Sequence, residues 1–131
     1  MYLVDTNIFL EGLLEQEKAQ TVGSFFQTID SEKIFITDLS LHSIGIILFR
    51  LGEHKLFDLF LDDVLIDGIS VLSLKPDALK KVDKVAQTFH LDFDDAYQYV
   101  VADEYNFQLI SFDSDFDKTV QGRKEPKEIV Q

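Results

Sequence analysis

The sequence has no cysteine, and only two prolines and six glycines occur among its 131 residues. The absence of cysteine excludes a disulfide framework, a zinc–thiolate site and a thiol nucleophile. So few prolines and glycines leave little room for a disordered linker. Hydrophobic residues make up 46% of the chain, which is enough to build a core, and we expect one domain that spans residues 1–131.

Long hydrophobic runs are missing as well. The longest apolar run covers residues 44–49, whereas a membrane-spanning helix needs about 20 apolar residues. Residues 1–5 contain no basic segment that leads into a long apolar stretch, as a targeting signal would. We therefore expect a cytoplasmic protein with no membrane partner.

Positive charge is scarce, with 12 basic against 24 acidic residues and a formal net charge of −12. This balance argues against a simple nucleic-acid-binding protein, because phosphate contacts require Lys and Arg. Eight of the 12 basic residues lie from Lys75 onward, which is typical of a solvated helix face followed by a charged tail. Many acidic residues lie where a metal site would need them, and bound cations would offset part of their charge.

Short apolar runs alternate with segments of helical periodicity. The predicted strands cover residues 3–4, 34–36, 70–72, 107–112 and 128–130. The predicted helices cover residues 8–14, 22–29, 37–49, 56–65, 76–86 and 92–104. Thr6 or Asn7 is the expected N-terminal cap of the first helix. Short strands alternating with helices favour a three-layer α/β/α fold around a central parallel sheet.

Acidic residues follow two of these strands and begin one helix. Asp5 follows the first strand, Asp113 and Asp115 follow the strand at 107–112, and Asp95 begins the preceding helix. Ligands of open α/β sheets bind beyond the carboxyl ends of the strands. Converging carboxylates repel one another unless a cation binds them, and oxygen ligands favour Mg²⁺ or Mn²⁺ over zinc. The pattern predicts a divalent-metal site suited to phosphodiester hydrolysis.

Each acidic residue also has a purely structural interpretation. Asp5 can cap the first helix, and Asp92 can cap the helix at 92–104. Asp94 and Asp95 would then interact with the dipole of that helix. Residues 113–115 can form an Asx turn between strand and helix. The metal interpretation depends on all of these acidic residues occurring together at strand ends and helix starts.

Three segments resemble the PIN-domain family, which includes the VapC-type toxins. They read VDTNIFL at 4–10, LDFDDAYQYVVA at 91–102 and LISFDSDFDKT at 109–119, in the order expected for the family. The resemblance extends over nearly the whole chain. It implies a compact fold with a parallel sheet of about five strands, a cleft at the carboxyl edge of that sheet, and a ribonuclease that depends on Mg²⁺ or Mn²⁺.

The resemblance also implies a set of site residues. The residues with implied catalytic and metal-binding roles are Asp5, Asp95 and Asp113, with Asp115 as a fourth metal ligand. The residues with implied supporting roles are Thr6, Asn7, Ser43 and Asp94. Members of the family usually place a Glu on the helix after the second strand, and Ser43 takes that position here. A neutral hydroxyl removes one negative charge, which should weaken metal binding, above all for a second ion.

Three functions follow as alternatives. The first is an active endoribonuclease acting on RNA, the toxin of a toxin–antitoxin pair. Its antitoxin would insert a short helix or an Arg into the acidic cleft, and family behaviour implies a homodimer. The second is a degenerate PIN domain that binds RNA or protein without cutting. The third is a phosphatase or phosphoacceptor domain, although no Lys directly follows the strand at 107–112, as a phosphoacceptor would require.

Overall fold

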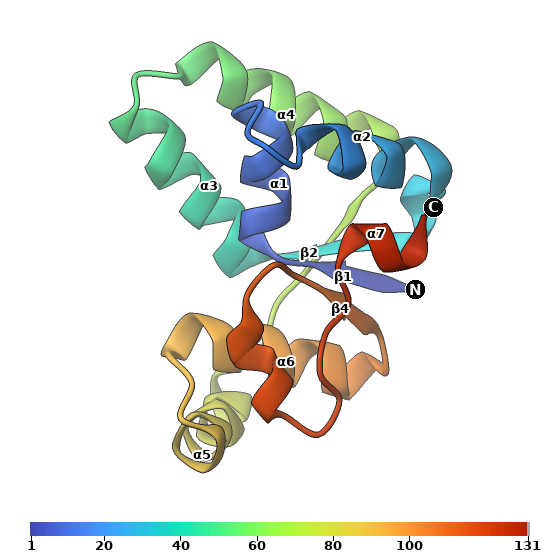
Figure 1. The fold of residues 1–131 in the computed structure, drawn as a ribbon. Coiled ribbons are helices and arrows are strands. Elements are labelled where there is room, and N and C mark those ends of the chain that lie inside the picture. Colours follow the sequence, from blue (N-terminus) through green and yellow to red (C-terminus); the bar gives the residue numbers. More distant parts are fainter. Residues whose placement is uncertain (131) are drawn as a thin grey trace.

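The computed structural model describes residues 1–130, and a four-stranded parallel sheet in the order β3-β2-β1-β4 lies at its centre (Figure 1). The strands are β1 (Tyr2–Val4), β2 (Ile34–Thr37), β3 (Ser70–Leu72) and β4 (Gln108–Ile110). Val4 pairs with Ile110, so β1 and β4 end at the same edge of the sheet. The chain passes from β3 on one side of β1 to β4 on the other. This change of direction creates the crevice in which open α/β sheets bind ligands.

Helices cover both faces of the sheet and give the predicted three-layer α/β/α fold (Figure 1). The helices are α1 (Thr6–Leu13), α2 (Ala19–Thr28), α3 (Asp38–Arg50), α4 (His54–Asp67), α5 (Leu79–Phe89), α6 (Phe93–Tyr105) and α7 (Pro126–Ile129). Three short 3₁₀ helices are η1 (Ser31–Lys33), η2 (Pro76–Ala78) and η3 (Ser114–Lys118). Helices α1–α4 and α7 lie over one face, and α5 and α6 lie over the other. No helix in residues 1–130 is long and apolar enough to cross a membrane.

Strand β1 separates two hydrophobic cores. Val4 packs with Phe25 and Leu48 on one face, whereas Leu3 packs with Val100 and Phe116 on the other. All six side chains are fully buried. Successive side chains of a strand point to opposite faces, so a strand covered on both faces is apolar at every position. The short apolar run before Asp5 therefore places Asp5 at the edge of a rigid, buried strand.

The strand predicted at 128–130 is wrong, because the structure places the short helix α7 there. Pro126 occupies the first turn of this helix, and Glu125 and Glu128 form a reciprocal capping box. Both features favour a helical turn over a strand. Lys124 instead forms a single parallel bridge with Ile110, so β4 gains a brief neighbour but not a fifth strand.

The predicted cap of the first helix also needs correction. The N-terminal cap of α1 is Asp5, whose side chain accepts a hydrogen bond from the backbone N–H of Thr6. The helix begins at Thr6, one residue after the strand ends, so neither Thr6 nor Asn7 caps it. The carboxylate at the strand end and the start of α1 are thus fixed together.

Candidate metal centre

Asp5 is held rigidly at the carboxyl end of β1 and is only 7% exposed. Its Oδ1 accepts hydrogen bonds from the Thr6 backbone N–H at 2.8 Å and the Gln98 side-chain amide at 2.9 Å. Its Oδ2 accepts a hydrogen bond from the Ser111 hydroxyl at 2.7 Å. A carboxylate offers about four lone-pair positions. Three are therefore used within the protein, which leaves Asp5 about one position for an external ligand.

Ser111 connects the ends of β1 and β4. Besides donating to Asp5, its hydroxyl accepts hydrogen bonds from the backbone N–H of Asp113 at 3.0 Å and the side-chain amide of Asn7 at 3.3 Å. The Asn7 carbonyl oxygen accepts from the backbone N–H of Phe112 at 3.2 Å. Of the four predicted supporting residues, Thr6 thus contacts Asp5 through its backbone, and Asn7 acts through Ser111.

Gln98 is a buried amide on α6 that donates to Oδ1 of Asp5, whereas Ser111 donates to Oδ2. Gln98 is 2% exposed, and its Nε2 donates to Asp5 at 2.9 Å and to the Ser40 hydroxyl at 2.6 Å. The Thr6 hydroxyl also donates to Ser40, at 2.8 Å. Within residues 1–130, the Gln98 carbonyl oxygen is the one buried side-chain polar atom without a hydrogen-bond partner. The Gln98 amide nitrogen therefore donates to the Asp5 carboxylate, while its buried carbonyl oxygen stays without a hydrogen bond, which is unfavourable.

Three further aspartates converge in front of Asp5. One carboxylate oxygen from each of Asp95, Asp113 and Asp115 lies within 4.8 Å of the other two. Asp95 lies in the first turn of α6, and Asp113 caps η3 by accepting from the backbone N–H of Asp115 at 2.9 Å. The last contact is the Asx turn that the sequence offered as an alternative. The turn and the cluster coexist, because the turn leaves most of the carboxylate positions free.

The pKa values of two aspartates reflect this crowding. Partial burial, together with the charges of Asp113, Asp5 and Asp115, raises the pKa of Asp95 to about 7. Burial also raises the pKa of Asp5, while the hydrogen bonds from Gln98, Ser111 and Thr6 oppose that rise. A carboxylate retains its proton near neutral pH when the negative charges around it are not neutralised. A bound cation would neutralise them and replace the proton.

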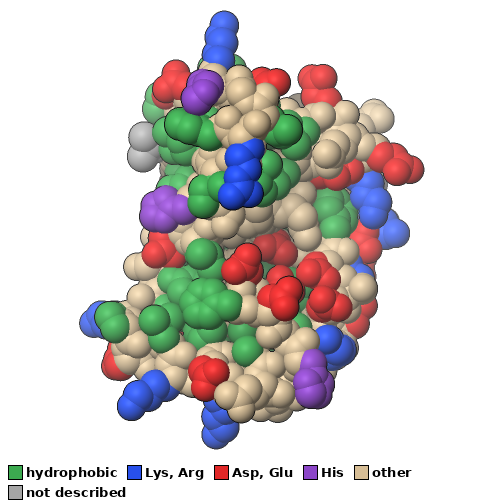
Figure 2. Space-filling view, turned by 90° about the vertical axis from the view of Figure 1, so that its left-hand side faces the viewer, with side chains coloured by type: hydrophobic (Ala, Val, Ile, Leu, Met, Phe, Trp, Pro, Cys, Tyr) green, Lys and Arg blue, Asp and Glu red, His purple; other side chains and the backbone are tan. Residues whose placement is uncertain are grey.

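A cleft of about 450 Å³ connects these residues. The residues that line it are Asp5, Thr6, Asn7, Leu10, Ser43, Ile46, Ile47, Arg50, Asp94, Asp95 and Asp113. Figure 2 shows acidic side chains gathered in the middle of this face of the molecule, between two hydrophobic areas. The structure thus brings seven of the eight predicted site residues to one cleft, and Asp115 joins them through the acidic cluster.

The donor set fits one divalent cation of the Mg²⁺ or Mn²⁺ type. All the donors are carboxylate oxygens, which these hard cations prefer. Asp95, Asp113 and Asp115 converge closely enough to share an ion, and Asp5 adds one free position beside them. Among the residues that line the cleft, the only side-chain oxygen donor from α3 is the neutral hydroxyl of Ser43. A second cation would therefore lack the carboxylate that it needs on that side.

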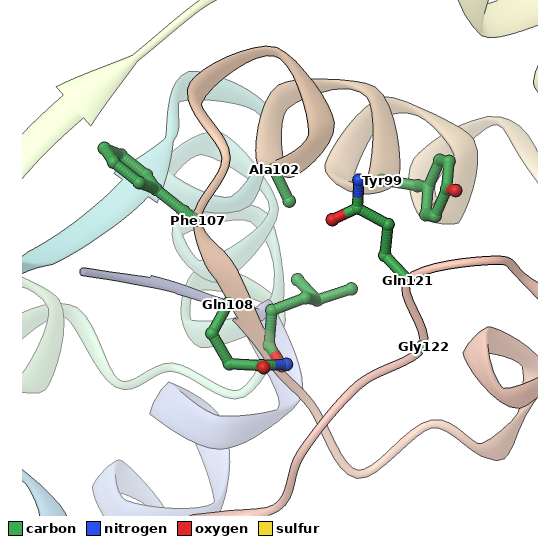
Figure 3. A pocket seen from close by; sticks show the side chains of 7 residues that line it. Tyr99, Ala102, Phe107, Gln108, Gln121 and Gly122 are labelled. Atoms are coloured by element: carbon green, nitrogen blue, oxygen red, sulfur yellow. The ribbon is translucent and has the colours of Figure 1, made fainter.

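A smaller cavity elsewhere has a different character. It measures about 30 Å³ and is lined mainly by Tyr99, Ala102 and Phe107 together with Gln108 and Gln121 (Figure 3). It lies at the amino end of β4, whereas the aspartates lie at the carboxyl end. Its volume suits a water molecule or two, so it does not compete with the acidic cleft as a candidate site.

Sequence reasoning missed three neutral residues of this site: Ser40, Gln98 and Ser111. Two of them carried a usable signal. Gln98 lies three residues after Asp95 on a helix, a spacing that places both on one face. Ser111 lies two residues before Asp113 in an extended segment, which brings both to the same side. Their contacts to Asp5 join residues about 100 positions apart, and local periodicity does not reveal such contacts.

A parallel sheet with aspartates at its carboxyl edge is the arrangement that the resemblance to PIN domains implied. The chain belongs to the PIN-domain family, whose model matches residues 2–121. This assignment replaces the phosphatase or phosphoacceptor alternative. No curated protein matches the chain.

Solved structures with the same fold include several from bacteria and archaea. A toxin–antitoxin complex from Klebsiella pneumoniae has 16% identity and a TM-score of 0.76, covering 96% of this chain and 98% of that one. VapC20 from Mycobacterium tuberculosis, described as a sarcin-ricin loop cleaving toxin, has 17% identity and a TM-score of 0.76, covering 89% and 93%. PAE2754 from Pyrobaculum aerophilum has 25% identity and a TM-score of 0.72, covering 98% and 90%.

Proposed function

We propose that this protein is a divalent-metal-dependent endoribonuclease that acts as the toxin of a toxin–antitoxin pair. The observation that carries the proposal is the convergence of Asp95, Asp113 and Asp115 beside the rigid Asp5 carboxylate. Mutual repulsion makes such an arrangement costly unless it serves a cation. Membership of the PIN family and the likeness to VapC20, a sarcin-ricin loop cleaving toxin, support the choice of RNA as substrate.

The roles of the residues follow from their positions. Asp95 and Asp113 would hold Mg²⁺ or Mn²⁺, with Asp115 as a further ligand and Asp5 filling the remaining position. When bound, the ion supplies an activated water and polarises the scissile phosphate. Gln98 and Ser111 favour the ionised form of Asp5 and fix its orientation, because both donate to its carboxylate. Asp94 lines the cleft and is exposed, which makes it a support for the local charge rather than a ligand.

Cleavage of labelled RNA by purified protein tests this proposal. We expect cleavage with Mn²⁺ or Mg²⁺, none with excess chelator, and loss of cleavage in Asp5→Asn and Asp113→Asn. The matched control is Asp117→Asn, because Asp117 pairs with Arg123 outside the cleft. Full activity in both site variants, or equal loss in the control, would count against the proposal.

An antitoxin partner is the second part of the proposal, and the K. pneumoniae toxin–antitoxin complex supports it. An Arg or a short helix of the antitoxin would enter the acidic cleft, where its positive charge complements the aspartates. A small protein encoded beside this one should therefore co-purify with it and suppress cleavage. Cleavage that persists when the two are mixed, with no complex on a sizing column, would argue against this pairing.

A homodimer is the third part. Ile46 and Phe49 on α3 and Leu51 at its C-terminal cap are 52%, 54% and 57% exposed. Such an apolar area is typical of an interface between copies. We expect a dimer by light scattering and a monomer for Phe49→Asp. A strict monomer at high concentration of the unaltered protein would refute the dimer.

The degenerate alternative rests on Ser43. If the missing carboxylate disables the site, the protein would bind RNA or a protein partner without cutting. Metal-dependent RNA cleavage that is lost on mutating Asp5 excludes this alternative. RNA binding without cleavage at any metal concentration favours it over the nuclease.

A further inference from the structure

The wall of the cleft that faces the aspartates is formed by α3. Ser43 and Arg50 lie seven residues apart on this helix, close to two full turns, so both project on the same side. Both line the cleft, with Ile46 and Ile47 between them. Arg50 is the one basic residue among those that line it. The cleft therefore has an acidic wall on α6 and η3 and a neutral-to-basic wall on α3.

Arg50 has no structural partner that explains its place. Arg123 pairs with Asp117 and Glu125, and Lys81 pairs with Asp103. The part of the chain that the structure describes records no ion pair for Arg50, as for most of its basic residues, and Arg50 is exposed. Its position in the last turn of α3 suits the helix dipole. The dipole explains a basic residue at this end of the helix but not its position at the rim of an acidic cleft.

The chemistry of the two walls differs in a way that matters for a phosphodiester. A carboxylate at the Ser43 position would repel phosphate and attract a second cation, whereas a hydroxyl does neither. A guanidinium two turns further along can donate two parallel hydrogen bonds to phosphate oxygens. Positive charge at the rim also opposes the repulsion between RNA and a chain of net charge −12.

We propose that Arg50 binds a backbone phosphate of the RNA adjacent to the one that is cut, on the wall where family members usually carry a carboxylate. Arg50 is then a substrate-binding residue and takes no part in the chemical step. The inference rests on the proposed function for the identity of the ligand. The inference concerns RNA binding and not the chemical step, so an experiment can reject the role of Arg50 without rejecting the nuclease, and the reverse.

The test measures RNA binding under conditions in which the RNA is not consumed. Fluorescein-labelled single-stranded RNA is titrated with protein in Ca²⁺, fluorescence anisotropy is recorded at several KCl concentrations, and gels verify that the RNA stays intact. The variants are Arg50→Gln and Arg50→Lys. The matched control is Lys33→Gln, because Lys33 is exposed and directly precedes β2, at the opposite edge of the sheet.

We expect Arg50→Gln to weaken RNA binding about tenfold, as expected for the loss of a charged hydrogen bond. Affinity falls with salt, and the steepness of log affinity against log salt should be smaller in Arg50→Gln by roughly 0.7, the value for one phosphate contact to a single strand. The RNA affinity of Arg50→Lys should lie between those of the unaltered protein and Arg50→Gln, since Lys keeps the charge but not the paired hydrogen bonds. In Mn²⁺, Arg50→Gln should raise the KM for RNA more than it lowers kcat. Lys33→Gln should match the unaltered protein throughout.

Two results would overturn this inference while leaving the nuclease intact. One is unchanged affinity and salt slope in Arg50→Gln. The other is an equal loss in Lys33→Gln, which would indicate a general effect of net charge. RNA binding that depends on Arg50 without any cleavage in Mn²⁺ would uphold the inference and remove the proposed function. If the unaltered protein binds no RNA, both the role of Arg50 and the proposed nuclease function are wrong.

Discussion

The segment after β4 contributes acidic side chains to two groups that have different surroundings. In the cleft, Asp95, Asp113 and Asp115 face one another, and none of them forms an ion pair within residues 1–130. A few residues further on, Asp117 and Glu125 each contact the Arg123 guanidinium at 3.1 Å. The second group, which we term the Arg123 cluster, is neutralised by the protein itself.

The difference shows what each group is suited for. Arg123 also donates to the backbone carbonyl of Ser111 at 3.1 Å, so the Arg123 cluster fastens the C-terminal segment to the end of β4. The cleft carries similar acidic residues, but none of its three clustered aspartates pairs with a cationic side chain in the described residues. Their mutual repulsion is therefore relieved by a proton or an external ion. Acidic residues in the Arg123 cluster should therefore affect stability, and those in the cleft should affect ligand binding.

The largest expected effect separates the two groups by metal affinity. Asp113→Asn should weaken Mn²⁺ binding by at least about 100-fold, because even supporting residues of metal sites contribute 10–100-fold. Asp117→Asn should leave the affinity unchanged. Calorimetric titration of the three proteins measures this. Equal affinities would remove the distinction between the two groups.

The next effect concerns the Arg123 cluster. Arg123→Met should lower the free energy of unfolding by about 1–2 kcal/mol, because three acceptors lose a charged donor and the side chain is only 13% exposed. Its Mn²⁺ affinity should change little. Urea denaturation with and without Mn²⁺ measures both quantities. A stability unchanged from the unaltered protein would show that the Arg123 contacts contribute nothing measurable.

A change on α3 tests whether the missing carboxylate limits the cleft. Ser43→Glu adds a carboxylate to the wall opposite Asp113 and should tighten Mn²⁺ binding about tenfold or add a second bound ion. The control is Ser43→Gln, which has the same shape without the charge. If both variants bind like the unaltered protein, the α3 wall lies too far from the ion to matter.

The smallest effect is a pH dependence of the metal-free protein. The pKa of Asp95 is raised to about 7, well above about 3.9 in an unfolded chain. Between these values the folded protein holds a proton that the unfolded chain has released, so stability from this group falls as pH rises through about 7. Thermal unfolding in chelator should show a lower Tm at pH 8 than at pH 5.5. Asp95→Asn should make the Tm depend less on pH. If the Tm of the variant falls with pH as steeply as that of the unaltered protein, the titration of Asp95 is not the cause.

The sequence predicted the parts of the site that depend on strand ends. Asp5 and Asp113 follow apolar runs whose pairing as β1 and β4 brings them to one edge, and this is a local pattern combined with a general rule of α/β sheets. The strand at 128–130 was predicted wrongly for a local reason. Pro126 and the capping pair of Glu125 and Glu128 outweigh the apolar character of the residues that follow.

The sequence could not predict how the site is supported. Gln98 and Ser111 are neutral and lie 93 and 106 residues from Asp5. Their roles arise only when α6 packs against the sheet and β4 pairs with β1. The place of Arg50 at the rim of the cleft likewise depends on the direction of α3, which its sequence does not reveal.

Anomalous diffraction from a crystal soaked in Mn²⁺ tests the central claim most directly, because it locates the ion without reference to activity. The account predicts one strong peak in the cleft, about 2.0–2.3 Å from carboxylate oxygens of Asp95 and Asp113. A map with no peak in the cleft at millimolar Mn²⁺, or with its main peak at Asp117 and Glu125, would contradict it.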